Sequence, residues 1–136
     1  MEGEKKKILI VDDDNFLLDM YALKFSQNNF EVYAATSGVH ALEKIKGGLN
    51  PDILLTDITM PEMDGFELLE KIKEGNLCKD SIRIILSNKN EQKDIDEGNR
   101  LEVDGYIVKA NSTPMEVINQ VIKILEKKVV KTMTKQ

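Results

Sequence analysis

Four short apolar runs of this chain each end in polar side chains that could act together on a substrate. In chain order these are Asp12, Asp13 and Asp14 after "KILIV", Asp57 after "DILLT", Ser87 at the end of "IRIILS" and Lys109 after "GYIV". If the runs are parallel strands of one sheet, their carboxyl ends lie along one edge. The sequence then predicts a cluster of carboxylates with one hydroxyl and one ammonium group.

The chemistry of such a cluster is that of phosphoryl transfer. Carboxylates that lie close together repel one another, and a bound cation relieves this repulsion. Mg²⁺ suits the position because it prefers hard oxygen ligands and keeps several waters. A carboxylate beside Mg²⁺ can attack phosphorus and form an acyl phosphate. Mg²⁺, the Lys109 ammonium and the Ser87 hydroxyl would then stabilise the phosphoryl oxygens in transit.

The elements that position these side chains can be read from hydrophobic periodicity. Five short apolar runs indicate strands, at 7–12, 30–36, 52–57, 82–87 and 105–109. Two of them contain the continuously apolar, β-branched stretches "ILIV" and "IIL", which are typical of parallel strands buried on both faces. Helical spacing indicates helices at 14–28, 38–46 and 65–74, with a last helix from Pro114. The segment 90–103 has few apolar residues, and we expect a short, polar helix there. We expect Asp14, Ser37 and Asp64 to cap helices, and Thr113 and Glu116 to form a capping box.

Strands that alternate with helices predict an α/β domain with right-handed crossovers, built as a doubly wound parallel sheet. Ligands of such sheets bind beyond the carboxyl ends of the strands. Asp57 lies at such an end, on a loop where Met60 and Pro61 cannot continue a central strand. We expect this loop, which Asp64 and Gly65 close, to present Asp57 and lead into the next helix.

Length and composition set further limits. The 136 residues suffice for one domain, and the net charge of −5 argues against a nucleic-acid-binding surface. Cys78 is the only cysteine, so the chain forms no internal disulfide, which fits the reducing cytoplasm. No signal peptide or transmembrane stretch is present, and we expect no membrane association.

Four motifs in a fixed order carry a family resemblance. They read "ILIVDDD", "DILLTDITMPEMDGFELL", "IRIILS" and "DGYIVK". The chain resembles the receiver domains of bacterial two-component response regulators, of the single-domain chemotaxis type, over about residues 5–128, with a basic tail at 129–136. The resemblance implies a flavodoxin-like fold with a five-stranded parallel sheet of order 2-1-3-4-5, flanked by about five helices.

The resemblance also implies roles for the acidic residues. Asp57 corresponds to the phosphoacceptor, Asp13 to the main Mg²⁺-binding carboxylate and Asp12 to a second acidic residue at the metal. The backbone carbonyl of Thr59 would complete the protein ligands. Asp14 precedes a helix, and we interpret it as a cap rather than a ligand.

The remaining roles concern the phosphoryl group and the output surface. By the same resemblance, Lys109 pairs with the phosphoryl group and Ser87 bonds it after phosphorylation. Tyr106 matches the aromatic switch residue, which turns inward when the hydroxyl group moves. Such a module would receive its phosphoryl group from a sensor histidine kinase or a phosphotransfer protein and bind a downstream protein through residues 90–128.

Several positions depart from the family pattern. Asn88 stands where Ala is frequent, near the mouth of the site, and Ala110 stands where Pro commonly follows the lysine. Glu102 stands where Gly often ends the fourth helix. Thr59 and Lys89 flank the phosphoryl group, at positions that tune hydrolysis in relatives. The lifetime of the phosphorylated state therefore does not carry over.

A second class of protein uses a similar constellation. Mg²⁺-dependent hydrolases and phosphotransferases of the haloacid-dehalogenase type also have a strand-end Asp, a Ser or Thr and a Lys. They usually need another Asp two residues after the nucleophile, and this chain has Thr59 there. Without that base an acyl phosphate should persist, as a signal requires. We therefore expect a module that catalyses only its own phosphorylation and slow dephosphorylation. A flavodoxin-like electron carrier ranks third, because no phosphate-binding loop follows the first strand.

Overall fold

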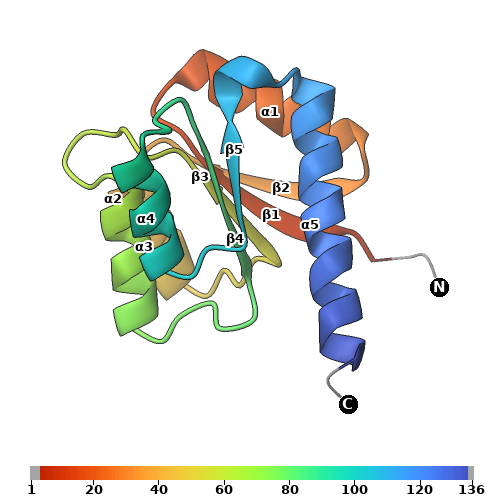
Figure 1. Cartoon of the computed structure of the whole chain (residues 1–136). Helices are drawn as coiled ribbons and strands as arrows, with labels where there is room; N and C mark the ends of the chain where they lie inside the picture. Colours follow the sequence, from red (N-terminus) through yellow and green to blue (C-terminus); the bar gives the residue numbers. More distant parts are fainter. Residues whose placement is uncertain (1–3, 135–136) are drawn as a thin grey trace.

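The computed structural model describes the backbone of residues 4–134 and the side chains of residues 4–128. In that part of the chain five strands alternate with five α-helices (Figure 1). The strands are β1 (Lys6–Val11), β2 (Phe30–Ala35), β3 (Ile53–Thr56), β4 (Ile82–Ser87) and β5 (Gly105–Val108). The helices are α1 (Asn15–Gln27), α2 (Gly38–Lys46), α3 (Gly65–Glu74), α4 (Gln92–Arg100) and α5 (Pro114–Thr134), with a short 3₁₀ helix at Lys109–Asn111.

All neighbouring strands pair in parallel, in the order β2-β1-β3-β4-β5. This confirms the predicted doubly wound sheet and its strand order. The register pairs Val11 with Thr56 and Ser87 with Val108. The residues that follow β1, β3, β4 and β5 therefore lie along one edge of the sheet, where the sequence predicted the site.

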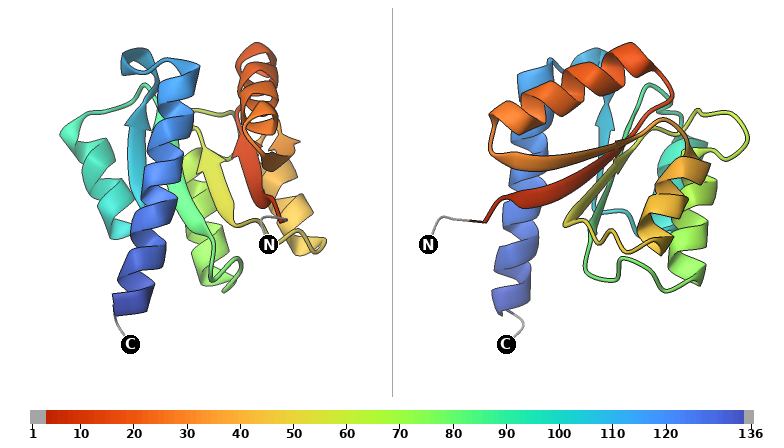
Figure 2. Two further views of the ribbon diagram at one scale, coloured as in Figure 1. Left: turned by 90° about the vertical axis from the view of Figure 1, so that its right-hand side faces the viewer. Right: turned by 180° about the vertical axis from the view of Figure 1, so that it is seen from behind.

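Helices cover both faces of the sheet (Figure 2). Along β1, Ile8 and Ile10 pack in a cluster with the buried sides of α1 and α5, whereas Leu9 and Val11 pack in a second cluster with α2 and α3. Adjacent residues of one strand thus enter opposite cores, which is why the strand sequence is apolar without alternation. The two cores fix the sheet edge on which the polar cluster lies.

The predicted helix caps are present. Asp14 accepts a hydrogen bond from the Leu17 N–H, and Ser37 accepts one from the His40 N–H. Reciprocal capping boxes start α3 and α5, formed by Asp64 with Glu67 and by Thr113 with Glu116. Each cap satisfies backbone donors that the first helical turn leaves free.

Helix α4 is shorter than the predicted helix at 90–103, which also took in the residues flanking it. Its buried residues are Asp94 and Gly98, so few apolar side chains hold it to the sheet. The helix ends at Arg100, Leu101 is its C-cap, and Glu102 then adopts a left-handed conformation with φ of 61°. The turn therefore keeps a backbone shape that favours Gly while carrying a Glu.

Helix α5 continues to Thr134, past the expected domain end at residue 128. Most of the segment expected as a tail, 129–136, thus prolongs the last helix, and residues 135–136 lie outside the described residues. Within residues 4–134, none of the helices has both the length and the apolar character needed to cross a membrane.

Candidate functional site

Lys109 joins two carboxylates at the edge of the sheet. Its Nζ lies 2.7 Å from Asp12 Oδ2 and 2.9 Å from Asp57 Oδ2. The three side chains are exposed by 10%, 3% and 11%, in the order Lys109, Asp12 and Asp57. Residues that follow β1, β3 and β5 therefore meet in one nearly buried ionic cluster, as the strand-end pattern predicted.

Burial and charge act in opposite directions on this cluster. Burial raises the pKa of Asp12, against the hydrogen bond from Lys109 and its charge, which lower it. Burial alone would lower the pKa of Lys109, but its hydrogen bonds to Asp12 and Asp57 outweigh that effect and raise it. The cluster therefore favours a charged ammonium, and a further cation would stabilise the charged form of the buried Asp12 carboxylate.

Asp13 adds an exposed carboxylate beside this cluster. Carboxylate oxygens of Asp12, Asp13 and Asp57 all lie within 4.8 Å of one another, and Asp13 faces solvent. An all-oxygen donor set with one open side fits a hard divalent cation such as Mg²⁺. Asp14 lies apart from this set as the cap of α1, as predicted. Thr59 lies in the exposed loop after Asp57, and its carbonyl as a ligand stays a prediction.

The backbone around Asp57 is held on both sides. The Asp57 N–H donates to the Val11 carbonyl at 2.9 Å, and the Asp57 Oδ1 accepts the Ile58 N–H at 2.7 Å. The Gly65 N–H donates to the Ile58 carbonyl at 2.8 Å and closes the loop 58–65. A Cβ at Gly65 would lie 2.1 Å from the Asp57 carbonyl oxygen, so only Gly fits there. The loop leads from Asp57 into α3, as the sequence predicted, and its closure at Gly65 also holds the Asp57 backbone against the start of that helix.

Ser87 ends β4, the strand next to β3, and Tyr106 lies on β5, one strand further from Asp57. Ser87 is 1% exposed, and its Oγ accepts the Lys89 N–H at 3.3 Å. The Tyr106 hydroxyl donates to the Lys89 carbonyl. Among the described residues, Ser87 shares no hydrogen bond with Asp57 or Lys109. The structure therefore joins the hydroxyl and the aromatic residue through the Lys89 backbone, and the role of Ser87 at the phosphoryl group stays a prediction.

A contact beside Lys109 was missed by reasoning from the sequence. The Ala110 N–H donates to Asn88 Oδ1 at 2.8 Å, and the Lys109–Ala110 peptide bond is trans. Both residues depart from the family pattern, and from the sequence the two departures were considered separately. The signal that could have joined them is the expected alignment of the fourth and fifth strands, which places residues 88 and 109 side by side.

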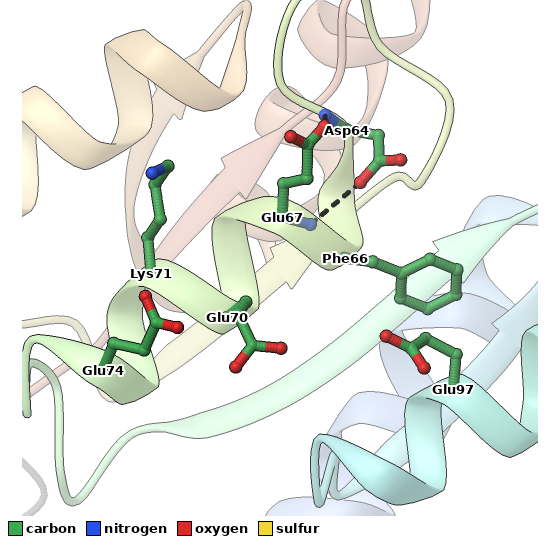
Figure 3. A pocket seen from close by; sticks show the side chains of 7 residues that line it. All are labelled: Asp64, Phe66, Glu67, Glu70, Lys71, Glu74 and Glu97. Atoms are coloured by element: carbon green, nitrogen blue, oxygen red, sulfur yellow. Dashed lines mark hydrogen bonds between the residues drawn. The ribbon is translucent and has the colours of Figure 1, made fainter.

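A groove of about 530 Å³ lies between α3 and α4, outside the aspartate cluster (Figure 3). Arg100 crosses between the helices and donates to both Glu70 and Glu97. The groove is lined mostly by acidic side chains, Asp64, Glu67, Glu70, Glu74 and Glu97, together with Phe66 and Lys71. No prediction was made for this groove from the sequence, and acidic residues on a helix face are commonly a solvated surface.

Comparisons with known sequences agree with this geometry. The sequence profile of the family described as "Response regulator receiver domain" matches residues 8–132. The chemotaxis protein CheY1 of Helicobacter pylori is 31% identical over 104 residues, which are 76% of this chain and 84% of CheY1. The alkaline phosphatase synthesis transcriptional regulatory protein PhoP of Bacillus subtilis is 30% identical over 122 residues, 90% of this chain and 49% of PhoP. The chain thus spans about half the length of that relative.

Solved structures share the fold. A CheY-like response regulator receiver domain protein from Methanospirillum hungatei matches with a TM-score of 0.84 and 26% identity, over 94% of this chain and 99% of that chain. The chemotaxis protein CheY4 of Vibrio cholerae matches with a TM-score of 0.82 at 24% identity, which shows the fold alone. These matches give no support to the hydrolase alternative. The family profile and the relatives together show that the chain belongs to the response regulator receiver domain family.

Proposed function

We propose that Asp57 accepts a phosphoryl group in a Mg²⁺-dependent reaction of a two-component phosphorelay in the cytoplasm. The observation that carries the proposal is the position of Lys109, which hydrogen-bonds Asp57 and Asp12 at the carboxyl edge of a parallel sheet. An ammonium beside the attacking carboxylate can neutralise the phosphoryl oxygens as they arrive. Membership of the receiver family supports the same chemistry.

The phosphoryl transfer needs no added base, because an ionised carboxylate is already a nucleophile. With acetyl phosphate as donor, a carboxylate oxygen of Asp57 bonds to phosphorus and the bond from phosphorus to the acetyl oxygen breaks. The electron pair leaves with acetate, and Asp57 becomes an acyl phosphate. Lys109 would move from the free carboxylate to the phosphoryl oxygens. Mg²⁺ bound by Asp12, Asp13, Asp57 and the Thr59 carbonyl would neutralise charge on the same oxygens.

The product is suited to signalling rather than turnover. Thr59 occupies the position where a hydrolase would carry its second Asp, so no carboxylate there activates water against the acyl phosphate. We therefore assign the chain slow self-dephosphorylation and no other substrate. Its donor would be a sensor histidine kinase or a phosphotransfer protein.

The signal would leave through residues 90–128. Phosphorylation would draw Ser87 toward the phosphoryl group and with it the Lys89 backbone, to which both Ser87 and Tyr106 are bonded. Tyr106 could then turn inward, and α4 is free to follow because few buried residues anchor it. The conformations of this surface before and after phosphorylation would bind a downstream protein with different affinities.

Intact-mass spectrometry after incubation with acetyl phosphate and Mg²⁺ tests the proposal. Wild-type protein should gain the mass of one phosphoryl group, and a chelator should suppress the gain. Asp57→Asn should gain nothing, because the amide is not a nucleophile of this kind. Asp52→Asn, just before the amino end of the same strand, is the matched control and should label like wild type. Equal labelling of wild type and Asp57→Asn would refute the assignment.

A further inference from the structure

The peptide unit between Lys109 and Ala110 is held at both of its polar atoms. Its N–H, on Ala110, donates to Asn88 Oδ1 at 2.8 Å. Its carbonyl, on Lys109, accepts the Ser112 N–H at 3.2 Å. A peptide unit that is bonded at both ends cannot rotate without breaking a hydrogen bond, so the backbone direction at Lys109 is set by these two contacts.

The Asn88 side chain extends the sheet by one step. The last registered pair between β4 and β5 is Ser87 with Val108, so Asn88 lies beside Lys109. Beyond that pair the side-chain oxygen of Asn88 takes the N–H that a strand carbonyl would take in a continued ladder. The bond therefore ties the loop after β4 to the loop that carries the ammonium.

The two family departures at these positions form one unit. The family pattern would place Ala at 88, which has no side-chain acceptor, and Pro at 110, which has no N–H to donate. Asn88 with Ala110 supplies both the acceptor and the donor. The pairing gives a physical reason for both residues, each of which is unexplained alone.

We propose that Asn88 is a positioning residue for Lys109, acting through the Ala110 N–H. The proposal rests on the phosphoacceptor function of Asp57. The chain from Asn88 through the peptide unit to Lys109 leads to Asp12 and Asp57, which the ammonium contacts at 2.7 and 2.9 Å. Asn88 itself is exposed and touches no reacting atom of the cluster. Removal of the hydrogen bond from the Ala110 N–H to Asn88 should leave the fold intact and make the position of the Lys109 ammonium less fixed.

The first experiment measures position and needs no phosphorylation. In ¹⁵N-labelled protein, nuclear magnetic resonance follows solvent exchange of the Ala110 amide and of the Lys109 ammonium protons. In Asn88→Ala both should exchange faster, roughly tenfold for the amide, because each loses part of its hydrogen bonding. Asn88→Asp keeps the acceptor oxygen and should retain slow exchange. Asn90→Ala, two residues along the same loop, is the matched control and should resemble wild type.

The second experiment measures the consequence for transfer. The initial rate of labelling by acetyl phosphate should fall roughly three- to tenfold in Asn88→Ala, since small displacements of a positioned group cost rate. In a Lys109→Ala background the Asn88→Ala change should not slow the rate or alter Mg²⁺ affinity further, because Asn88 acts only through Lys109.

The outcomes separate the two proposals. If wild type is not labelled, the phosphoacceptor function fails, whereas the exchange data still decide the position of Lys109. If the Ala110 amide exchanges faster while exchange of the Lys109 ammonium is unchanged, Asn88 only stabilises the loop and the inference is overturned. An equal further loss of rate or of Mg²⁺ affinity in both backgrounds would overturn it too, since Asn88 would then act by another route. If Asn88→Ala unfolds, Asn88→Ser takes its place in every comparison.

Discussion

The ammonium of Lys109 and the carboxylate of Asp12 form a nearly buried ion pair with an N–O distance of 2.7 Å, between residues 97 positions apart in sequence. The same ammonium contacts Asp57, so one side chain neutralises much of the negative charge that would attract a divalent cation to the cluster. Under the proposed function, Lys109 and a divalent cation would therefore compete for the same carboxylates, although both would serve the same reaction.

Lys109→Ala should therefore separate binding from transfer. Mg²⁺ should bind several-fold more tightly, because the two carboxylates lose their cationic partner. Labelling by acetyl phosphate should become much slower, because the arriving phosphoryl oxygens lose the same cation. Isothermal titration calorimetry measures the affinity, because the chain has no Trp whose fluorescence could report metal binding. Lys79→Ala, in the loop at the amino end of β4, is the control, and an unchanged or weaker affinity in Lys109→Ala would contradict the competition.

Two neighbouring aspartates should give opposite signatures. Asp13→Ala should weaken Mg²⁺ binding by roughly tenfold or more and cut phosphorylation, because it removes a hard ligand from the cluster. Asp14→Ala should leave the affinity unchanged and lower the free energy of unfolding by about 1 kcal/mol, because it removes the cap of α1. Calorimetry measures the affinity and urea unfolding the stability. If Asp14→Ala weakened Mg²⁺ binding and Asp13→Ala did not, the assignment of Asp13 as ligand and Asp14 as cap would be wrong.

Phosphorylation should change amide exchange mainly around residues 87–92 and 100–110, while 14–28 stays quiet. The Lys89 backbone links Ser87 and Tyr106, so a shift at one reaches the other. Ser87→Ala should keep phosphorylation and blunt the exchange change. Hydrogen–deuterium exchange with mass spectrometry checks this. Changes confined to 57–65, or unaltered in Ser87→Ala, would point to a different output face.

Glu102→Gly should stabilise the protein. The left-handed backbone at Glu102 is strained for any residue with a Cβ, and Gly relieves the strain at some cost in unfolded-state entropy. We expect a net gain of about 0.5–1 kcal/mol in the free energy of unfolding, measured in urea. The ion pair lost with Lys73 is largely exposed and contributes little. Glu102→Ala loses the same pair and keeps the strain, so it should not stabilise.

Tyr106 should make stability fall at high pH. Burial, followed by the charges of Asp94 and Asp57, raises the pKa of Tyr106 to about 12 in the folded state. The unfolded phenol ionises near pH 10, so its contribution is intact below about pH 10 and lost between about 10 and 12. Tyr106→Phe should therefore show a shallower loss of stability across that range, measured by urea unfolding at a series of pH values. Parallel curves would show that Tyr106 ionises normally.

Local signals made the fold predictable. The runs "ILIV" and "IRIIL" form strands because each is buried by helices on both faces, and this removes any alternation from the sequence. The capping boxes at Asp64 and Thr113 marked helix starts because their chemistry needs only neighbouring residues. The cluster of Asp12, Asp57 and Lys109 was predictable because strand order alone brings strand ends together.

Other features depended on distant contacts. The helix predicted at 90–103 was too long because this segment has few apolar residues to mark its ends, whereas α4 stops at Arg100 and buries Asp94. The bond from Ala110 to Asn88 could not be read from either residue alone, since it needs the register of two strands. Local composition does not contain such information.

The closure of the Asp57 loop by Gly65 has a consequence for how the family can diversify. The hydrogen bond to Ile58 and the close approach to Asp57 fix both ends of the loop regardless of what its exposed residues are. Thr59, Pro61 and Glu62 face solvent and can be exchanged without moving the acceptor. Under the proposed function, substitutions at these positions would change how water reaches the acyl phosphate, and with it how long the signal lasts, without changing whether the chain folds.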